Sequence, residues 1–409
     1  MTHRSNVKLG VEVFLEKFLD LVKSKRVGLI TNPTGIDSNV ISTITLFTNT
    51  PDIHLVALYG PEHGVRGDAK AGEYVPYRRD EKLDIPVFSL YGQAQKPDPD
   101  MLANIDESMR SFDTADEGKG IEPSMVENID VLVFDIQDVG TRIYTYIATM
   151  AYAMQACAEN NKEFIVLDRP NPINGTDMEG PILEYPKYSS FVGLYPIPVR
   201  HGMTVGELAL LFNANFLSQK TNLTVIPMKG WERSMWFDET ALPWIFPSPN
   251  MPSLETATVY PGQVFLEGTN VSEGRGTSKP FEVFGAPWID GAQLAKVLNG
   301  LKLPGVRFQE TWFNPEISKY QGQVCEGAQI HVMDRTRFKP FITSMFIIQA
   351  IMDKNLEKFL FHDEYFDKIM GTRTVREELE EHHDVTKIMN KFCDALDVFR
   401  NLRKPHLLY

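Results

Sequence analysis

Short, almost wholly apolar segments recur along the first part of the chain, and each stops at a loop rich in Gly, Pro, Asn or Asp. They cover residues 27–30, 55–59, 131–134, 164–167 and 197–199. Amphipathic stretches of helical length, such as residues 147–158 and 205–216, separate them. Strands that are apolar on both sides and alternate with helices are typical of a parallel sheet covered on both faces. The sequence therefore predicts a doubly wound α/β fold with a mostly parallel sheet.

The character of the sequence changes after about residue 235. A chain of 409 residues is too long for one ordinary hydrophobic core, so two domains are expected. Beyond this point Pro and Gly become frequent in loops, a helix is expected from Asp290, and a strand is expected at residues 329–332. We predict a catalytic α/β domain at residues 1–235 and a smaller auxiliary α+β domain at residues 236–409.

Composition and charge exclude several classes of protein. The net charge of −13 argues against a nucleic-acid partner, because neutralising phosphates needs a basic face. No apolar run approaches the roughly 20 residues that span a bilayer, so no membrane span is predicted. The N-terminus lacks the pattern of a signal peptide, which favours the cytoplasm, or export if a leader was removed. Cys157, Cys325 and Cys393 have no metal-binding spacing.

Charged and amide side chains follow the predicted strands directly. Ligands of doubly wound sheets bind beyond the carboxyl ends of the strands, so these residues are the candidates for an active site. Arginines stand out in so acidic a chain, and they indicate a local site for an acidic group. The candidates are Asn32, Glu62, His63, Arg66, Asp135, Asp138, Arg142, Asp168, Arg169, Asn171, Arg200 and His201.

Glu62 is the strongest single candidate. Gly60-Pro61 before it and Gly64 after it fix the backbone and let a substrate approach closely. A carboxylic acid in such a place is suited to act as a general acid on a glycosidic oxygen. The alternative is a glutamate that caps a loop or pairs with Arg66.

Two further loops offer groups to the same ligand. Asp135 and Asp138 follow one buried strand, and Arg142 and Tyr144 come shortly after them. The alternative is an ordinary helix N-terminus in which aspartates cap the helix and form an ion pair with the arginine. Arg200 and His201 precede a helix that Thr204 is expected to cap, and a guanidinium beside a positive helix end suits a carboxylate. A purely structural histidine is the alternative for His201.

Other charged segments have less specific signals. Asp168 is expected to bind sugar, whereas Arg169 and Asn171 fit a rigid, internally paired turn as well as a site. The glycine-punctuated residues 267–277 predict a loop that reaches over the crevice of the first domain. The acidic segment at residues 104–123 is expected to be a solvated insertion, and His382-His383-Asp384 a solvated face rather than a metal site.

The sequence resembles a known family at these residues. The matching stretches are GLITNPTG, YGPEHGVRGDAKAG, IPVFSLYG, DVLVFDIQDVGTRIYTY, VLDRPNPING, PVRHGMTVGELA, PWIFPSPNMPSLETATVYPG, FLEGTNVSEGRGTSKPFEVFGAPWID and CEGAQIHV. They are similar to the exo-β-N-acetylmuramidases of the NamZ type, long catalogued as a domain of unknown function. The resemblance implies a Rossmann-like catalytic domain, a smaller auxiliary domain, and a site in the cleft between them.

The implied reaction is cell-wall hydrolysis, the release of N-acetylmuramic acid from the non-reducing ends of bacterial peptidoglycan fragments. The family's PEHG glutamate falls on Glu62, and its RHGMT pair falls on Arg200 and His201. Its GTN-SEGRGT motif falls on Asn270, Glu273 and Arg275. The lactyl carboxylate of N-acetylmuramic acid would account for the arginines. Two departures are the length of the acidic segment and the missing export signal.

We therefore expect a glycoside hydrolase in which Glu62 protonates the leaving oxygen and Asp138 or Glu273 acts as base or nucleophile. No cofactor or metal is expected, and the partner is a small muropeptide or disaccharide, with the oligomeric state unknown. The expected substrate-binding residues are Asn32, His63, Arg66, Asp135, Arg142, Tyr144, Asp168, Asn171, Arg200, His201, Asn270 and Arg275. Two alternatives are a non-catalytic muropeptide-binding protein and a metal-dependent hydrolase with Asp135, Asp138, Asp168 and His201 as ligands.

Overall fold

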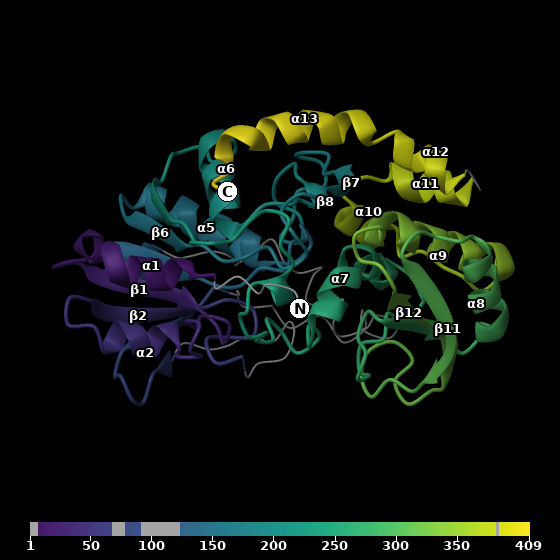
Figure 1. Ribbon diagram of the computed structural model, residues 1–409, viewed down its shortest axis with the longest axis horizontal. Helices are drawn as coiled ribbons and strands as arrows, with labels where there is room; N and C mark the ends of the chain where they lie inside the picture. Colours follow the sequence, from purple (N-terminus) through teal and green to yellow (C-terminus); the bar gives the residue numbers. More distant parts are fainter. Residues whose placement is uncertain (1–6, 68–77, 91–122, 382–383) are drawn as a thin grey trace.

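The computed structural model describes residues 7–67, 78–90, 123–381 and 384–409. The acidic segment of residues 104–123, apart from Pro123, lies outside them, and so do His382 and His383. The chain forms two halves that lie side by side, each with its own sheet (Figure 1).

The first half is built on a seven-stranded sheet in the order β3-β4-β2-β1-β5-β6-β9. All neighbouring strands run parallel except the short edge strand β3, which is antiparallel to β4. Without β3 the order reads 3-2-1-4-5-6 in chain sequence, which is the Rossmann order, so the fold prediction is confirmed. The strands are β1 (Arg26–Thr31), β2 (His54–Gly60), β3 (Arg78–Arg79), β4 (Pro86–Ser89), β5 (Val131–Asp135), β6 (Glu163–Leu167) and β9 (Asn222–Ile226).

Helices cover both faces of this sheet because its central strands are apolar on both sides. In β5, Leu132 and Phe134 point into one hydrophobic cluster, and Val131 and Val133 point into the other. The first cluster includes side chains of α5 (Tyr146–Glu159) and α6 (Val205–Asn215). The second includes those of α1 (Gly10–Lys17) and α2 (Thr43–Thr48). The remaining helical turns are η1 (Leu19–Leu21) and α4 (Pro123–Val126).

One predicted strand does not belong to the main sheet. The segment expected at residues 197–199 forms β8 (Pro198–Arg200), which pairs antiparallel with β7 (Glu179–Ile182) in a separate two-stranded sheet. The edge position beside β6 is taken by β9 instead. Most of β9 is only half-buried, and its sequence mixes Asn and Thr with apolar residues. It was therefore not predicted as a strand, because the prediction relied on continuous apolar segments.

The second half is an antiparallel sheet with helices packed against it, as expected of a smaller α+β unit. Its strands β10 (Val283–Ala286), β11 (Val306–Phe313) and β12 (Cys325–Val332) have the order β10-β12-β11. The helical elements are η3 (Phe237–Glu239), α7 (Leu254–Gln263), η4 (Val264–Gly268), α8 (Gly291–Gly300), α9 (Pro340–Lys354), α10 (Asp363–Met370), α11 (Thr374–Glu380), α12 (Val385–Asn390), α13 (Cys393–Arg403) and η5 (Lys404–His406).

The two halves share buried contacts. Val139 and Ile143, from the loop between β5 and α5, belong to the same hydrophobic cluster as Phe265 and Phe341 of the second half. Helix α13 runs back across the molecule from the second half and brings the C-terminus beside α6 (Figure 1). The loop after β5 is therefore fixed by both halves at once.

Arg142 in that loop holds the halves together through carbonyl oxygens. Its side chain is buried, and Nη1 donates to the carbonyls of Pro181 and Ile197 at 3.1 and 3.0 Å. Nη2 donates to Ile369 and Met370 at 2.9 and 2.7 Å, at the carboxyl end of α10 where the helix dipole favours a cation. Burial lowers the pKa of Arg142 to about 9, so the group remains a cation at neutral pH.

We predict that Arg142→Met lowers the free energy of unfolding by at least about 3 kcal/mol, because four buried carbonyls lose their donor. Urea denaturation measures the loss. The matched control is Arg26→Met, which removes a half-exposed pair with Asp130 and is expected to cost less than about 1 kcal/mol. Equal losses in the two variants would contradict the assigned role.

Candidate active site

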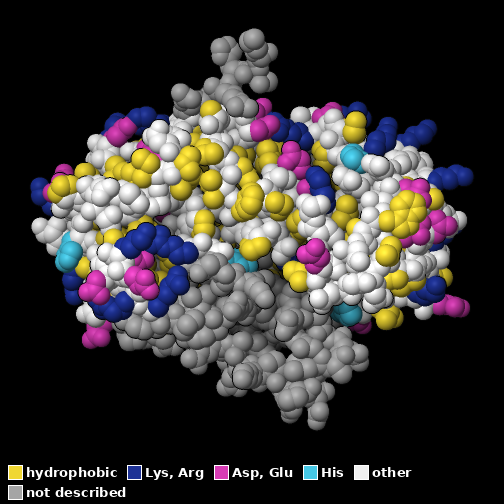
Figure 2. Space-filling view, turned by 90° about the horizontal axis from the view of Figure 1, so that it is seen from below, with side chains coloured by type: hydrophobic (Ala, Val, Ile, Leu, Met, Phe, Trp, Pro, Cys, Tyr) yellow, Lys and Arg dark blue, Asp and Glu magenta, His cyan; other side chains and the backbone are white. Residues whose placement is uncertain are grey.

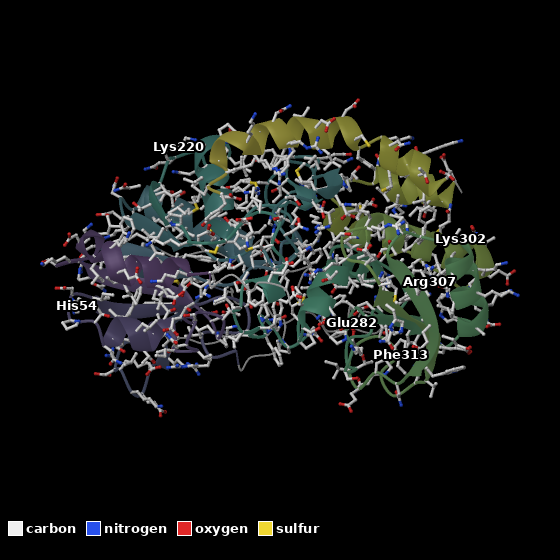
Figure 3. The ribbon with its side chains drawn as sticks, in the orientation of Figure 1. His54, Lys220, Glu282, Lys302, Arg307 and Phe313 are labelled. Carbon is white, nitrogen blue, oxygen red and sulfur yellow. The ribbon has the colours of Figure 1, made fainter. Side chains whose placement is uncertain are left out.

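The carboxyl ends of the parallel strands face the second half of the molecule. His54, the first residue of β2, lies at the outer end of the first half, whereas Lys302, Arg307 and Phe313 lie in the second half (Figure 3). Strand order reverses between β1 and β5, which pair directly, and this switch point is where Rossmann-like sheets bind ligands. The loops after β1, β2 and β5 are therefore placed to form a site.

A pocket opens at this edge of the sheet. The first half provides Glu62, His63, Ile143, Tyr144, Thr145 and Tyr146, and the rest of the lining is Ser248, Asn250, Met251, Tyr260, Glu267, Arg275 and Phe281. Residues from both halves are thus needed to build it.

Glu62 is held in this pocket by a tight turn after β2. Its side chain is buried, and Thr145 Oγ1 donates to Oε2 at 3.0 Å. His63 has a left-handed backbone with a φ of 71°, a conformation that costs energy in a residue with a Cβ and is found at functional sites. The turn directs both Glu62 and His63 into the pocket lining.

Three tyrosines surround the carboxyl group. Tyr144 makes edge-on contacts with Tyr146 and Tyr260, with ring centroids 5.0 and 5.8 Å apart. Burial raises the pKa of all three phenols, and the charge of Glu62 raises it further. The phenols therefore stay protonated as hydrogen-bond donors. The Tyr144 hydroxyl is buried and makes no well-aligned hydrogen bond among the described residues, and Ser248 and Tyr146 are its polar neighbours.

Asp138 and His201 form a buried pair behind the pocket. Asp138 Oδ2 accepts the N–H of Gly140 at 2.7 Å and lies 3.5 Å from His201 Nε2. His201 Nδ1 accepts the N–H of Met203, which places the proton of the neutral ring on Nε2, facing the carboxylate. Asp138 Oδ1 is buried with no hydrogen-bond partner in the described part of the chain. Asp138 also raises the pKa of Tyr146 and Tyr260, so it lies within electrostatic reach of the pocket wall.

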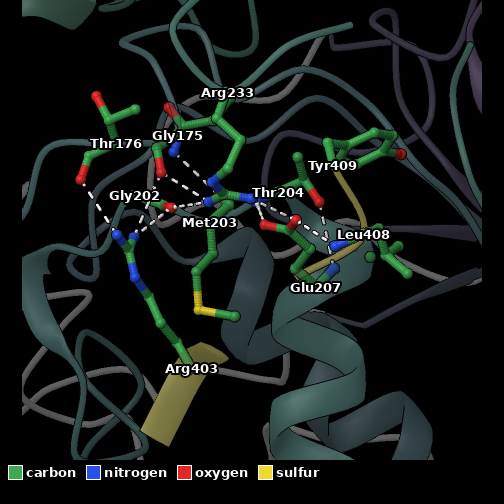
Figure 4. Close-up of polar contacts among 12 residues, drawn as sticks. Gly175, Thr176, Gly202, Met203, Thr204, Glu207, Arg233, Arg403, Leu408 and Tyr409 are labelled. Carbon is green, nitrogen blue, oxygen red and sulfur yellow. Dashed lines mark hydrogen bonds and ion pairs between the residues drawn. The ribbon is translucent and has the colours of Figure 1, made fainter. Parts of the chain in front are cut away.

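The C-terminal segment holds the loop that carries His201. Arg403 of α13 donates to the carbonyls of His201 and Gly202 at 3.2 and 2.6 Å (Figure 4). Arg233 also donates to Gly202 and pairs with Glu207 of α6 at 2.6 Å (Figure 4). Gly202 has a φ of 60°, and a Cβ there would meet the guanidinium of Arg403 at 2.6 Å. The position of His201 therefore depends on helix α13, which returns from the second half.

Asp168 belongs to this structural network and is not exposed to the pocket. Its carboxylate accepts hydrogen bonds from Thr204 Oγ1 at 2.8 Å, from the N–H of Gly206 at 2.7 Å and from the Tyr409 hydroxyl at 2.6 Å. Burial raises its pKa to about 7 despite these donors. Asp168 anchors the last residue of the chain to the start of α6.

Several other candidates are engaged with protein groups. Asp135 forms a buried bidentate pair with Arg169 at 2.6 and 2.9 Å. Arg200 pairs with Glu179 at 2.8 Å, lies 3.3 Å from Asp177 and has only 1% of its side chain exposed. Arg142 binds four carbonyls, as described above. None of these groups is in the described pocket lining: Asp135 and Arg200 are engaged in ion pairs, and Arg142 is engaged by carbonyl oxygens.

Asn171, Asn270 and Arg66 also bond within the protein. Asn171 Nδ2 donates to the Met203 carbonyl at 2.9 Å, and Asn270 bridges Lys358 and Leu360 in the second half. Arg66, about half exposed, pairs with Asp80 at 2.8 Å. None of the three is among the described residues that line the pocket.

The loop at residues 267–277 supplies the pocket wall from the second half, where the sequence predicted a loop reaching over the crevice. Arg275 lines the pocket, and its Nε and Nη2 donate to Glu267 Oε1 at 3.1 and 2.6 Å. Glu273 lies behind it, 3.0 Å from Lys319 and 3.5 Å from Arg275. Of the residues predicted in this loop, Arg275 alone is in the described lining.

Sequence reasoning missed Thr145, Tyr146, Tyr260 and Glu267. Tyr146 and Thr145 lie only one or two residues beyond Tyr144, so the run RIYTY contained the signal. Tyr260 is in α7 and Glu267 in η4, where helical spacing suggests ordinary packing. Their role is visible only once the second half is folded against the first.

Among the described residues, no three His, Cys, Asp or Glu side chains are grouped so that they could hold a metal ion. Two of the four ligands expected for a metal-dependent hydrolase bind protein groups instead: Asp135 pairs with Arg169, and Asp168 accepts a hydrogen bond from Tyr409.

Within the described residues, no helix has both the length and the apolar character needed to cross a membrane.

Comparisons with known proteins agree along nearly the whole chain. A family model described as the N-terminal part of exo-β-N-acetylmuramidase NamZ matches residues 27–119 and 115–255, and one described as its C-terminal part matches residues 258–409. The peptidoglycan β-N-acetylmuramidase NamZ of Bacillus subtilis strain 168 is 48% identical over 407 residues, covering 99% of this chain and 92% of that relative. Two crystal structures of DUF1343 family proteins from Bacteroides fragilis match with TM-scores of 0.86 and 0.77, at 38% and 31% identity, each covering 99% of both chains.

The raised pKa of Asp168 predicts a pH-dependent stability. The folded protein binds the proton more tightly than the unfolded chain, whose carboxyl titrates near 3.8. The stability that this proton provides is complete below pH 4 and is lost as the pH rises to about 7, by roughly 4 kcal/mol. Unfolding curves from pH 4 to 8 should therefore show a less negative slope in Asp168→Asn than in the wild type.

Asp177→Asn is the control for this measurement. Burial alone would raise the pKa of Asp177, but Arg200 and Lys339 lower it overall, so its contribution has the opposite sign and is lost as the pH falls. The assignment for Asp168 fails if both variants change the slope in the same direction.

Proposed function

The chain belongs to the NamZ family of exo-β-N-acetylmuramidases, and from this premise we propose that it is a glycoside hydrolase that releases N-acetylmuramic acid from the non-reducing ends of peptidoglycan fragments. The proposed substrate is a small muropeptide or disaccharide with a β-linked N-acetylmuramic acid at its non-reducing end. The pocket between the two halves is lined by polar and aromatic side chains that can hydrogen-bond to a sugar and pack against it.

The observation that carries the proposal is the environment of Glu62. It is a buried carboxyl group in a pocket lined from both halves, beside three phenols and a threonine hydroxyl. In the proposed reaction Glu62 gives its proton to the glycosidic oxygen as the bond to the anomeric carbon breaks. Thr145 holds the carboxyl group in place, and Tyr144 and Tyr260 keep water away while donating hydrogen bonds to the sugar. The Tyr146 hydroxyl donates to the Pro247 carbonyl instead.

Asp138 is the better supported of the two candidates for the second carboxylate. Its Oδ1 has no hydrogen-bond partner among the described residues, and His201 holds the other side of the group. Glu273 is paired through one oxygen with Lys319 and through the other with Arg275. A carboxylate that is to activate water or attack a sugar needs a lone pair that no protein group occupies, and Asp138, which lies behind the pocket lining, is the candidate that has one in the described part of the chain.

Arg275 is the proposed partner of the lactyl carboxylate. It is the arginine in the described pocket lining, and its Nη1 makes no hydrogen bond within the described residues, whereas Nε and Nη2 are held by Glu267. Glu267 is itself fixed by the Tyr365 hydroxyl at 3.0 Å. A guanidinium oriented in this way can direct one N–H to an anionic group of the sugar.

We predict that Glu62→Gln lowers kcat on a chromogenic β-N-acetylmuraminide by about 10²- to 10⁴-fold, because the amide cannot donate the catalytic proton. The melting temperature should stay close to that of the wild type. Glu282→Gln is the control, since Glu282 is buried against Thr256 and Lys279 outside the pocket lining. Retention of near-wild-type turnover by Glu62→Gln would remove it from the mechanism. The matching β-N-acetylglucosaminide, which lacks the lactyl group, should be a poor substrate for every variant.

The two candidate carboxylates can be separated by kinetics and stability together. Asp138→Asn is expected to lower kcat at least about 100-fold with a small change in KM and in melting temperature. Glu273→Gln is expected to lower the melting temperature, because Lys319 and Arg275 lose a buried anion. The reverse pattern would assign the second catalytic role to Glu273.

A further inference from the structure

Lys319 is a buried lysine that the proposed mechanism does not use. Its side chain is 10% exposed, and Nζ donates to the carbonyls of Leu266 and Val271 at 2.7 and 3.0 Å and to Glu273 Oε2 at 3.0 Å. These three acceptors match the three donors of an ammonium group. Val271 and Glu273 belong to the loop that presents Arg275 to the pocket. Lys319 is therefore bonded directly to that loop.

The backbone on both sides of Lys319 is strained. Ser318 and Tyr320 have left-handed backbones with φ of 73° and 60°, conformations that cost energy in residues with a Cβ. The Tyr320 hydroxyl donates to the Asn270 carbonyl at 2.6 Å and accepts the indole N–H of Trp288 at 3.0 Å, which ties the strained segment to the same loop. Strain that is retained beside a binding loop indicates that the side chain between the two residues has a function there.

Two carboxylates and two cations meet behind the pocket wall. Nε and Nη2 of Arg275 donate to Glu267 at 3.1 and 2.6 Å, and Nε lies 3.5 Å from Glu273. The side chains of Glu273, Glu267, Lys319 and Arg275 are only 2, 8, 10 and 13% exposed. Hydrophobic side chains gather over the middle of the face seen in Figure 2, between the two halves. Charges withdrawn from solvent in this way are screened much less by salt than surface charges.

The charge balance of this cluster depends on Lys319. Burial would lower the pKa of Arg275, but the charges of Glu267 and Glu273 raise it overall, so both carboxylates act on the guanidinium. With Lys319 the cluster has two negative and two positive charges and no net charge. Without Lys319 it would have one excess negative charge beside the group that is to bind an anion. Like charges placed together in this way disfavour binding.

We propose that Lys319 enables Arg275 to bind an anionic group and thereby determines the preference of the pocket for a sugar that carries a carboxylate. Glu267 and Glu273 hold the guanidinium, but together they outweigh its charge. Lys319 cancels the second carboxylate from the side of the loop opposite to its role in lining, since it is not itself among the described lining residues. This inference rests on the proposed function, because it takes Arg275 as the partner of the lactyl carboxylate.

The test measures by calorimetry the Kd of N-acetylmuramic acid and that of N-acetylglucosamine, which lacks the lactyl group. KM and kcat on the chromogenic β-N-acetylmuraminide are measured beside them. Lys319→Met is expected to raise the Kd of N-acetylmuramic acid and the KM at least about 10-fold, because the cluster becomes negative, while kcat and the Kd of N-acetylglucosamine change less than about threefold. Lys279→Met is the matched control, since Lys279 pairs with the buried Glu282 at 2.8 Å outside the pocket lining, and it should change none of these quantities.

A compensating variant separates the charge of Lys319 from a purely structural role. Lys319→Met combined with Glu273→Gln removes one charge of each sign, so the Kd of N-acetylmuramic acid should return to within about threefold of the wild-type value. A lysine that only held the loop in place would not be rescued in this way. Glu273→Gln alone leaves the cluster with a positive charge and should bind N-acetylmuramic acid at least as tightly as the wild type. This last measurement tests the charge balance even if Lys319→Met does not fold.

Three results would overturn the proposal. They are unchanged binding of N-acetylmuramic acid in Lys319→Met, no recovery in the double variant, and weaker binding in Glu273→Gln. Equal affinity of the wild type for the two sugars would also contradict it. If the wild type does not hydrolyse the muraminide, the proposed function fails, whereas the binding series still decides the role of Lys319.

Discussion

The buried guanidinium of Arg142 is the interaction on which the site depends most. The Arg142 side chain extends from the loop after β5. It donates hydrogen bonds to carbonyls of the first half and to carbonyls at the carboxyl end of α10 in the second half. The same loop carries Asp138 before it and Tyr144 and Thr145 after it, so one cation fixes the groups that surround Glu62. A pocket shared by two halves requires such a fixed boundary, because a small rotation between them would separate Thr145 from Tyr260 and Arg275.

The arginines show how an acidic chain uses its cations. Arg200 was expected at the substrate, and Arg169 was expected either in an internally paired turn or at the site. Both pair with buried carboxylates, Glu179 and Asp135 respectively. A buried carboxylate without a partner costs several kcal/mol, so a fold that carries acidic residues at its strand ends needs cations inside as well as at the ligand. Charge alone therefore does not separate a structural arginine from a binding one. Arg275 differs because it lines the pocket and, within the described parts of the chain, its Nη1 makes no hydrogen bond.

The fold could be predicted because its central strands are apolar on both sides. This pattern can be recognised in each segment alone, without knowing which strands lie beside it. The edge strand β9 escaped because it is half-buried, and β8 was assigned to the wrong sheet because apolar character does not reveal which strand pairs with which. Of the site residues predicted from the sequence, Glu62, His63, Tyr144 and Arg275 line the pocket. Tyr260 and Glu267 lie in helical elements of the second half, and only its packing against the first brings them to Glu62.

The turn after β2 bears a strained residue next to Glu62. His63 has a left-handed backbone, and both Glu62 and His63 line the pocket. Gly60, at the start of the same turn, has no room for a Cβ, which would lie 2.8 Å from the Val65 nitrogen. The direction in which Glu62 enters the pocket thus follows from one tightly constrained backbone conformation.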